Sequence, residues 1–261
     1  MTRSYHGMPC WFELGTSDLD GAGAFYGKLL GWELGDSGMP GFDYRLAKAN
    51  GQMVAGMMSL DDQPPGTPPN WVIYFAVDSA DDTARDAVAK GARVLKEPAD
   101  IPDTGRFAIL SDPQGVVFGI LQPAPMETEP EAYAFDQRKE GHGNWLELMT
   151  PDQEAALDFY TGQFGWTRST AVPMGEHGTY QLFARDGADI GGMMRSGGEP
   201  PPAWFPYFGV NGIDAAIERA KGAGGQLVHG PQEVPGGAFI AWFADPQGAM
   251  FAVVGPKSRA A

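Results

Sequence analysis

The chain repeats itself, and this constrains its fold more than any other feature. Residues 11–32, WFELGTSDLDGAGAFYGKLLGW, align without gaps on residues 145–166, WLELMTPDQEAALDFYTGQFGW, and ten of the 22 positions are identical. Three later segments recur in the same order: 56–58 as 192–194, 71–77 as 204–210, and 111–115 as 244–248. Self-similarity at a fixed offset predicts two homologous halves.

Each half contains two similar repeats. A tryptophan stands at positions 11, 71, 145 and 204; an Asp or Asn follows seven residues later, and a glycine twenty residues later. This spacing predicts a strand near the tryptophan, a helix that begins near the Asp or Asn, and a helix end at the glycine.

Within each repeat, the pattern predicts one helix and several short strands. Ala22, Phe25, Tyr26 and Leu29 recur at helical spacing. Asn-Gly at 50–51 and Asp-Pro-Gln-Gly at 112–115 and 245–248 are typical of turns between strands. Each repeat is therefore predicted to be β-α-β-β-β. The predicted repeats are 7–60, 70–122, 142–196 and 203–255, in domains 1–122 and 142–256 joined by a Pro- and Glu-rich linker at 123–141.

Four such repeats, with FYGKLLGW after the first strand and SDPQG before the last, resemble the vicinal oxygen chelate superfamily. This is the group of glyoxalase I, bleomycin-resistance proteins and extradiol dioxygenases, and the chain is most similar to its tandem, two-domain glyoxalase-like members. The resemblance implies an α+β fold in which each pair of repeats forms a cupped, mixed eight-stranded sheet around a cavity. It also implies, for metal enzymes, ligands on the first and last strands of the repeats.

The positions that match those ligands carry no coordinating side chain. On the first strands they are Trp11, Trp145, Val72 and Phe205, with Trp71 and Trp204 as the alternatives to the last two. On the last strands they are Gly56, Gly119, Gly192 and Ala252. Divalent metals bind imidazole, carboxylate or thiolate groups. We therefore expect no metal cofactor, unless a divalent ion binds at ligands outside this register.

A large aromatic side chain opposite glycine or alanine could leave an aromatic-lined pocket, or it could simply fill the sheet as core. If there is a pocket, its predicted substrate-binding residues are Trp11, Met58, Tyr74, Arg106, Trp145, Met194 and Tyr207. Arg106 could equally be a solvent-exposed arginine, since the second half has Phe239 there.

Glu13 and Glu147 are the catalytic candidates. Each lies two residues after a tryptophan, so strand alternation puts it on the same face. A carboxylate there could act as a general base, anchor a polar ligand group, or form a structural pair. The four histidines have no metal-site spacing, and His142 near Glu147 is the residual candidate.

Composition excludes several classes of function. The formal net charge of −15 argues against nucleic acid or an anionic membrane as partner. The single cysteine, Cys10, rules out an intrachain disulfide and is read as packing. The first residues show no signal-peptide pattern, so a cytoplasmic protein is expected. It is expected to be a monomer with an internal pseudo-twofold or a homodimer.

Two functions of different class remain open. The first is metal-free binding of a small aromatic molecule, with the acidic charge favouring a cation. The alternative is an enzyme of the same superfamily, a glyoxalase-like lyase, hydroxylase or dioxygenase. It would use Glu13 or Glu147 as base, or a metal at other ligands.

Overall fold

The computed structural model describes residues 5–39, 41–125, 133–198 and 201–258. Every repeat has the predicted βαβββ order. Repeat 1 comprises β1 (Pro9–Thr16), α1 (Leu19–Leu30), β2 (Glu33–Asp36), β3 (Tyr44–Ala49) and β4 (Gln52–Ser59), followed by a short 3-10 turn, Leu60–Asp62. Repeat 2 comprises β5 (Asn70–Ala76), α2 (Ala80–Ala89), β6 (Arg93–Ile101), β7 (Gly105–Ser111) and β8 (Val117–Pro123).

The second half follows the same order. Repeat 3 comprises β9 (Gly143–Thr150), α3 (Gln153–Phe164), β10 (Thr167–Pro173), β11 (Thr179–Arg185) and β12 (Ala188–Arg195), with a 3-10 turn at Gly175–His177. Repeat 4 comprises β13 (Ala203–Gly209), α4 (Ile213–Gly222), β14 (Gln226–Glu233), β15 (Phe239–Ala244) and β16 (Met250–Gly255).

The strands form two mixed sheets of eight, in the orders β2-β3-β4-β1-β5-β8-β7-β6 and β10-β11-β12-β9-β13-β16-β15-β14. In each repeat the first strand pairs in parallel with the last, and the other neighbouring strands of the same repeat are antiparallel. The predicted α+β fold of four βαβββ repeats is confirmed. The predicted linker includes 126–132, which lie outside the described residues. In its described remainder Ala134 and Phe135 are buried, and Phe135 bridges to Gly143.

The predicted helix caps are confirmed in repeats 1 and 3, and the N-caps are shifted by one residue in repeats 2 and 4. Ala22, Phe25, Tyr26 and Leu29 are the buried face of α1. Asp18 and Asp152 cap α1 and α3 through their side chains, and Gly31 and Gly165 end those helices in the left-handed conformation. In repeats 2 and 4 the N-caps are one residue further on, at Ser79 and Gly212.

The chain packs into two compact units that do not follow chain order. The first comprises Met1–Cys10, Ile73–Glu131 and Leu146–Trp204, and the second comprises Trp11–Val72, Ala132–Trp145 and Phe205–Ala261. The first unit thus contains most of repeats 2 and 3, and the second contains most of repeats 1 and 4.

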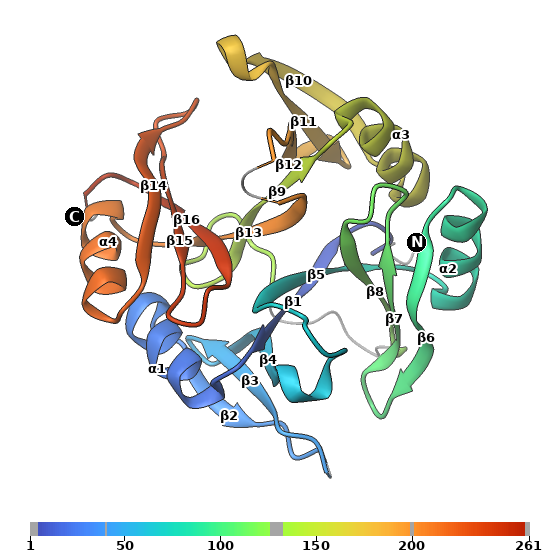
Figure 1. Cartoon of the computed structure of the whole chain (residues 1–261), viewed down its shortest axis with the longest axis horizontal. Coiled ribbons are helices and arrows are strands. Elements are labelled where there is room, and N and C mark those ends of the chain that lie inside the picture. Colours follow the sequence, from blue (N-terminus) through green and yellow to red (C-terminus); the bar gives the residue numbers. More distant parts are fainter. Residues whose placement is uncertain (1–4, 40, 126–132, 199–200, 259–261) are drawn as a thin grey trace. The chain divides into compact units, whose positions relative to one another are not determined.

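Within each unit two helices contact each other. In the second unit α1 lies beside α4 (Figure 1), and Lys28 Nζ donates a hydrogen bond to the carbonyl of Gly222 at 3.0 Å. Arg219 Nε donates in the other direction, to the carbonyl of Leu29 at 3.1 Å. In the first unit α2 contacts α3, and Lys90 Nζ donates to the carbonyl of Gly162 at 2.6 Å. In both units a lysine therefore binds the C-terminal turn of the neighbouring helix, where cations are favoured.

Within the described residues, no helix combines the length and apolar character that crossing a membrane would require.

Candidate functional site: the tyrosine-covered faces of the sheets

The face of repeat 1 that carries Glu13 is built around one tyrosine hydroxyl. Phe12 and Leu14 point into the core with no exposed surface, so Trp11 and Glu13 lie on the opposite face and are partly exposed. Tyr44 donates its hydroxyl hydrogen to Glu13 Oε2 at 2.9 Å and accepts from Trp11 Nε1 at 2.8 Å. The predicted common face of Trp11 and Glu13 is confirmed, and Tyr44 joins them.

Tyr44 also covers the glycine at the family's ligand position. Leu46 pairs with Gly56 and Tyr44 with Met58, so all four side-chain positions share this face. A Cβ built on Gly56 would lie 1.9 Å from the Tyr44 hydroxyl, so the ring occupies the space that a side chain there would need. Burial and the Glu13 carboxylate hold the pKa of Tyr44 well above its usual range, so this phenol remains protonated.

Repeat 3 has an equivalent pair of tyrosine and glutamate above a glycine. Tyr180 donates its hydroxyl hydrogen to Glu147 Oε2 at 3.1 Å, and a Cβ on Gly192 would lie 2.1 Å from the Tyr180 ring. Met194 follows on the same strand face, partly exposed, while Met193 is buried. Glu147 is only 7 % exposed and is therefore more enclosed than Glu13.

In repeat 2 the covering tyrosine comes from the first strand. Tyr74 pairs with Gly119, and a Cβ on that glycine would lie 2.3 Å from the Tyr74 ring. Ile109 pairs with Gly119 from the other side, so it shares this face, as does Val72. Val72 and Ile109 are partly exposed.

In repeat 4 the corresponding face is filled with aromatic rings. Tyr207 pairs with Ala252, and Trp242 pairs with Ala252 from the other side. Trp242 Nε1 donates to the Tyr207 hydroxyl at 2.6 Å, and the rings of Phe205 and Trp242 lie 4.9 Å apart. All three aromatic side chains are buried.

In repeats 2 and 4 the sequence left two neighbouring residues as alternatives for the first-strand ligand position, and the structure distinguishes between them. Trp71 and Trp204 point into the core, where their Nε1 atoms donate to Tyr26 and Tyr160, each at 3.0 Å. Val72 and Phe205 therefore hold the positions on the tyrosine-covered faces. Among the described residues, no group of three or more His, Cys, Asp or Glu side chains is placed to hold a metal ion.

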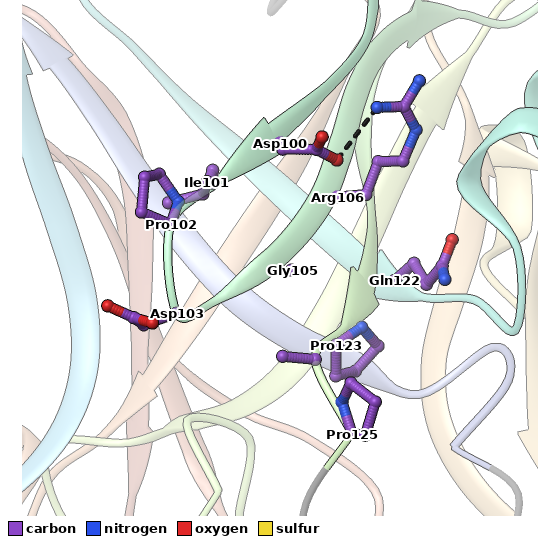
Figure 2. Close-up of a pocket in the computed structure, with 10 residues that line it drawn as sticks. Asp100, Ile101, Pro102, Asp103, Gly105, Arg106, Gln122, Pro123 and Pro125 are labelled. Carbon is purple, nitrogen blue, oxygen red and sulfur yellow. Dashed lines mark hydrogen bonds and ion pairs between the residues drawn. The ribbon is translucent and has the colours of Figure 1, made fainter.

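Arg106 is separated from the Tyr74 face by strand alternation. It shares its face with the buried Ala108 and pairs with Asp81 of α2 and with Asp100, at 2.7 and 2.9 Å. Figure 2 shows it on the wall of an open surface pocket of about 370 Å³, beside Gln122 and the turn that joins β6 to β7. Its guanidinium therefore lies over the helix side of the sheet, so Arg106 and Tyr74, both predicted as substrate-binding residues, do not share a face.

Two buried chains of hydrogen bonds explain the Asp-Pro-Gln-Gly motifs. Tyr160 donates to Asp112 Oδ2 at 3.1 Å and accepts from Trp204, while Asp112 Oδ1 accepts from backbone amides of its own turn. In the other unit Tyr26 donates to Asp245 Oδ2 at 3.0 Å and accepts from Trp71. Burial is the main cause that raises the pKa of both carboxyls, and the amide and phenol donors partly offset it. Each chain connects three repeats within one compact unit: repeats 2, 3 and 4 in the first unit, and repeats 1, 2 and 4 in the second.

His142, the residual candidate, is enclosed. His142 is 1 % exposed and its ring nitrogens have no hydrogen-bond partner among the described residues. Burial is the main cause that lowers the pKa of His142, and the negative charge of Asp136 acts in the opposite direction. Cys10 donates its Sγ hydrogen to the carbonyl of Tyr74, and burial raises the pKa of its thiol.

Sequence reasoning missed Tyr44, Tyr180 and Trp242. A signal existed for the two tyrosines, because each stands twelve residues before the glycine that it covers, Gly56 or Gly192. The repeat alignment would have paired them. Trp242 has no counterpart in the first half, where Ile109 stands, so the alignment gave no reason to select it.

Two mixed sheets built from four βαβββ repeats, with Trp, Phe, Val, Ala or Gly at each position where metal enzymes carry ligands, define a tandem glyoxalase-like protein. The sequence profile of the Glyoxalase/Bleomycin resistance protein/Dioxygenase superfamily matches residues 10–120 and 143–253. The chain belongs to this superfamily.

Similar proteins span its whole length. "Putative glyoxylase CFP32" of Mycobacterium tuberculosis is 34 % identical, covering 97 % of this chain and 96 % of the relative. "Anthracycline biosynthesis protein DnrV" of Streptomyces peucetius is 30 % identical, covering 97 % and 95 %. The crystal structure of the Mn(II)-bound glyoxalase from Novosphingobium aromaticivorans superposes with a TM-score of 0.66 at 18 % identity. That superposition covers 98 % of this chain and 84 % of the glyoxalase, and it shows a shared fold.

Proposed function

We propose that this protein binds a small aromatic molecule, preferably a cation, on the tyrosine-covered faces of its sheets without a metal ion. The observation that carries the proposal is the Trp11–Tyr44–Glu13 cluster. It places two aromatic rings and a carboxylate around one hydroxyl, above a glycine where metal enzymes of the family have a ligand.

The chemistry of this cluster suits a flat cation. Aromatic faces attract cations through their quadrupole, and a partly buried carboxylate adds a directed negative charge. The net charge of −15 would raise the local concentration of a cationic ligand. The name of DnrV links that relative to the biosynthesis of anthracyclines, which are polycyclic aromatic compounds. This supports an aromatic ligand class here.

The positions that match metal ligands support the metal-free part of the proposal. Gly56, Gly119 and Gly192 have no side chain, and a ring lies over each of them. Glycine and alanine offer no donor atom, and divalent ions need imidazole, carboxylate or thiolate groups. We therefore derive no step that uses a metal at these positions.

Fluorescence titration with ethidium, a planar aromatic cation, tests the proposal. Glu13→Gln should weaken ethidium binding about tenfold, which corresponds to about 1.4 kcal/mol. The matched control is Glu33→Gln, which removes the same charge from an exposed position of β2 and should leave the affinity unchanged. Absence of binding, or equal losses in both variants, would refute the proposal.

A thermal-shift titration with Mn²⁺, Zn²⁺, Ni²⁺ and Fe²⁺ tests the metal-free part separately. A metal ion that binds only the folded state would raise the melting temperature in a saturable way. We expect no such rise, because the positions that match metal ligands carry no donor atom. A saturable stabilisation by one ion would contradict this part and favour metal chemistry.

The Tyr44–Glu13 hydrogen bond favours a second candidate function, an enzyme of the same superfamily with a carboxylate base. Glu13 Oε2 could accept a substrate proton in place of the Tyr44 hydrogen, and Glu147 could do the same beside Tyr180. An assay with the hemithioacetal of methylglyoxal and glutathione tests the lyase form. Turnover that is lost in Glu13→Gln would favour this candidate over simple binding.

A further inference from the structure

A pocket of about 390 Å³ lies where the end of α1 meets α4, within the second compact unit (Figure 1). Its walls come from the last turn of α1 with its glycine C-cap, from the residues that follow β13, and from α4. The charged residues that line it are Lys28, Arg219 and Glu140. No lining residue belongs to the Trp11–Tyr44–Glu13 cluster, so this pocket is separate from the proposed aromatic site.

Backbone carbonyls hold the two cations of the pocket in place and leave their charges unpaired. Lys28 Nζ donates to the carbonyl of Gly222 at 3.0 Å, and Arg219 Nε donates to the carbonyl of Leu29 at 3.1 Å. In the described part of the chain these are the only hydrogen bonds of the two side chains, and neither forms an ion pair with Glu140 or another carboxylate. An ammonium has three N–H donors and a guanidinium has five, so most of their donors can bind a ligand.

Several arginines of this protein are neutralised by an acidic neighbour, and Arg219 is not. The chain has 33 acidic and 18 basic residues, so carboxylates are abundant. Five arginines pair with an Asp or a Glu: Arg45, Arg85, Arg106, Arg168 and Arg185. Arg219 shares its pocket with a second cation instead, and an anion bound there would compensate both charges.

The first compact unit contains an equivalent place, which matching hydrogen bonds identify. Trp32 Nε1 donates to the carbonyl of Gly141, and Trp166 Nε1 donates to the carbonyl of Gly7, each at 2.8 Å. These residues also correspond in the repeat alignment. The surroundings of the two places can therefore be compared position by position.

In the first unit a histidine ring occupies this place. His6, the equivalent of Glu140, has its Nε2 at 3.1 Å from the carbonyl of Gln163, and its Nδ1 accepts from a backbone amide at 3.4 Å. Gln163 is the equivalent of Leu29, whose carbonyl binds Arg219 in the second unit. The same carbonyl position thus binds a histidine in one unit and an arginine in the other.

The charges at three further positions differ as well. The second unit has Asn211, Ala215 and Arg219 on the pocket wall. At the equivalent positions the first unit has three acidic residues: Asp78, Asp82 and Asp86. Only the second unit therefore replaces carboxylates by an amide, a methyl group and a guanidinium at this place.

From these differences we infer that the pocket between α1 and α4 binds a phosphate group. A guanidinium can bind two oxygens of a phosphate or carboxylate at once, and a lysine adds a point charge. Two cations favour a doubly charged phosphate over a singly charged carboxylate, and the exposed Glu140 weakens the attraction. The net charge of −15 repels anions from the rest of the surface, so binding is confined to this pocket. The inference goes beyond the proposed function and does not depend on it.

An NMR titration of the isotope-labelled protein with inorganic phosphate tests the inference. The amide signals of Gly31 and Asn211, both on the pocket wall, should shift in a saturable way, with a dissociation constant of about 1 mM. Acetate, titrated in parallel, should bind more weakly because it carries a single charge. Absence of saturable shifts, or shifts confined to other parts of the chain, would overturn the inference, and acetate binding as tight as that of phosphate would overturn the choice of phosphate.

Four variants test the roles of the charges. Arg219→Gln should weaken phosphate binding about tenfold, because it removes a charged hydrogen-bond donor. Lys221→Gln is the matched control, since it removes the same charge from the last turn of α4 at an exposed position outside the pocket, and it should change the affinity less than about twofold. Ala215→Asp introduces the residue type of the first unit at an exposed position and should weaken binding about fivefold, whereas Glu140→Gln should strengthen it about threefold.

The variants also separate binding from folding. Arg219→Gln loses the hydrogen bond to Leu29, so circular dichroism must show that it folds, whereas Ala215→Asp keeps every side-chain hydrogen bond of the pocket. Equal losses of affinity in Arg219→Gln and Lys221→Gln would overturn the inference, because they would indicate a general effect of charge. An unchanged affinity in Ala215→Asp, or weaker binding in Glu140→Gln, would overturn it as well.

Discussion

Removal of the Tyr160 hydroxyl should destabilise the protein strongly, because that one oxygen serves two buried partners. It donates to Asp112 Oδ2 at 3.1 Å and accepts from Trp204 Nε1 at 3.0 Å, and the side chain has no exposed surface. Tyr160→Phe therefore removes a hydrogen bond to a carboxylate, worth about 1.5–3 kcal/mol, and leaves an indole N–H unpaired at a cost of about 1–3 kcal/mol. Since such terms are not additive, we expect a loss of about 2–4 kcal/mol in the free energy of unfolding.

The loss should depend on pH, and the sign follows from Asp112. Burial raises the pKa of this carboxyl, and the Tyr160 hydrogen bond lowers it by favouring the charged form. Without the hydroxyl the pKa of Asp112 rises further, so the charged form is less stable in the folded variant. The deficit of Tyr160→Phe is then fully present at neutral pH and shrinks as pH falls through the folded-state pKa of Asp112.

Urea denaturation followed by circular dichroism at pH 7 and at about pH 4.5 measures both effects. Tyr26→Phe is the matched variant, because Tyr26 donates to Asp245 and accepts from Trp71 in the other compact unit, both at 3.0 Å. The two variants should lose similar stability. A loss below about 1 kcal/mol, or one that is the same at both pH values, would refute the reasoning.

Two further predictions concern a buried histidine and a helix end. Burial lowers the pKa of His142, so its contribution to stability is present above the unfolded pKa, near 6.5, and is lost as pH falls towards the folded value. His142→Leu should abolish that decline; melting temperatures from pH 8 to pH 5 measure it, and an unchanged pH slope would contradict the argument. Gly165→Ala should cost about 1 kcal/mol, because φ is +67° at this C-cap and the space around it is open. Gly162→Ala, inside α3, is the control and should not destabilise, because its Cβ would lie 3.7 Å from Lys90 Nζ, an ordinary contact distance; equal losses in chemical denaturation would count against the backbone explanation.

Local features of the site were readable from the sequence because they depend on short spacings. The alternation of Phe12 and Leu14 with Trp11 and Glu13 predicted which side chains share a face, and the structure confirms it. The Asn50–Gly51 turn has the positive φ values of the predicted hairpin. Tyr74 and Tyr207 were selected for the correct face, since their place on the first strand of repeats 2 and 4 follows from the alignment.

Contacts between strands were not readable. Tyr44 lies over Gly56 only because β3 pairs with β4 in a register that puts Leu46, not Tyr44, directly beside the glycine. Because Gly56 has no Cβ, the Tyr44 ring can occupy the space above this glycine. A sequence shows that a position is glycine, but not which neighbouring side chain uses the space.

Four βαβββ repeats in two homologous halves could be predicted from the residues alone, because the spacings of strands, helix caps and turns are properties of neighbouring residues. Which repeats pack together became clear only from the folded chain. It joined repeat 1 with 4 and repeat 2 with 3 in compact units, each secured by a buried carboxylate that accepts from a tyrosine of the other repeat. Trp242 is a further example, because its indole donates a hydrogen bond to Tyr207, which lies on another strand of the sheet. Burial couples residues distant in the chain, and no local spacing records that coupling.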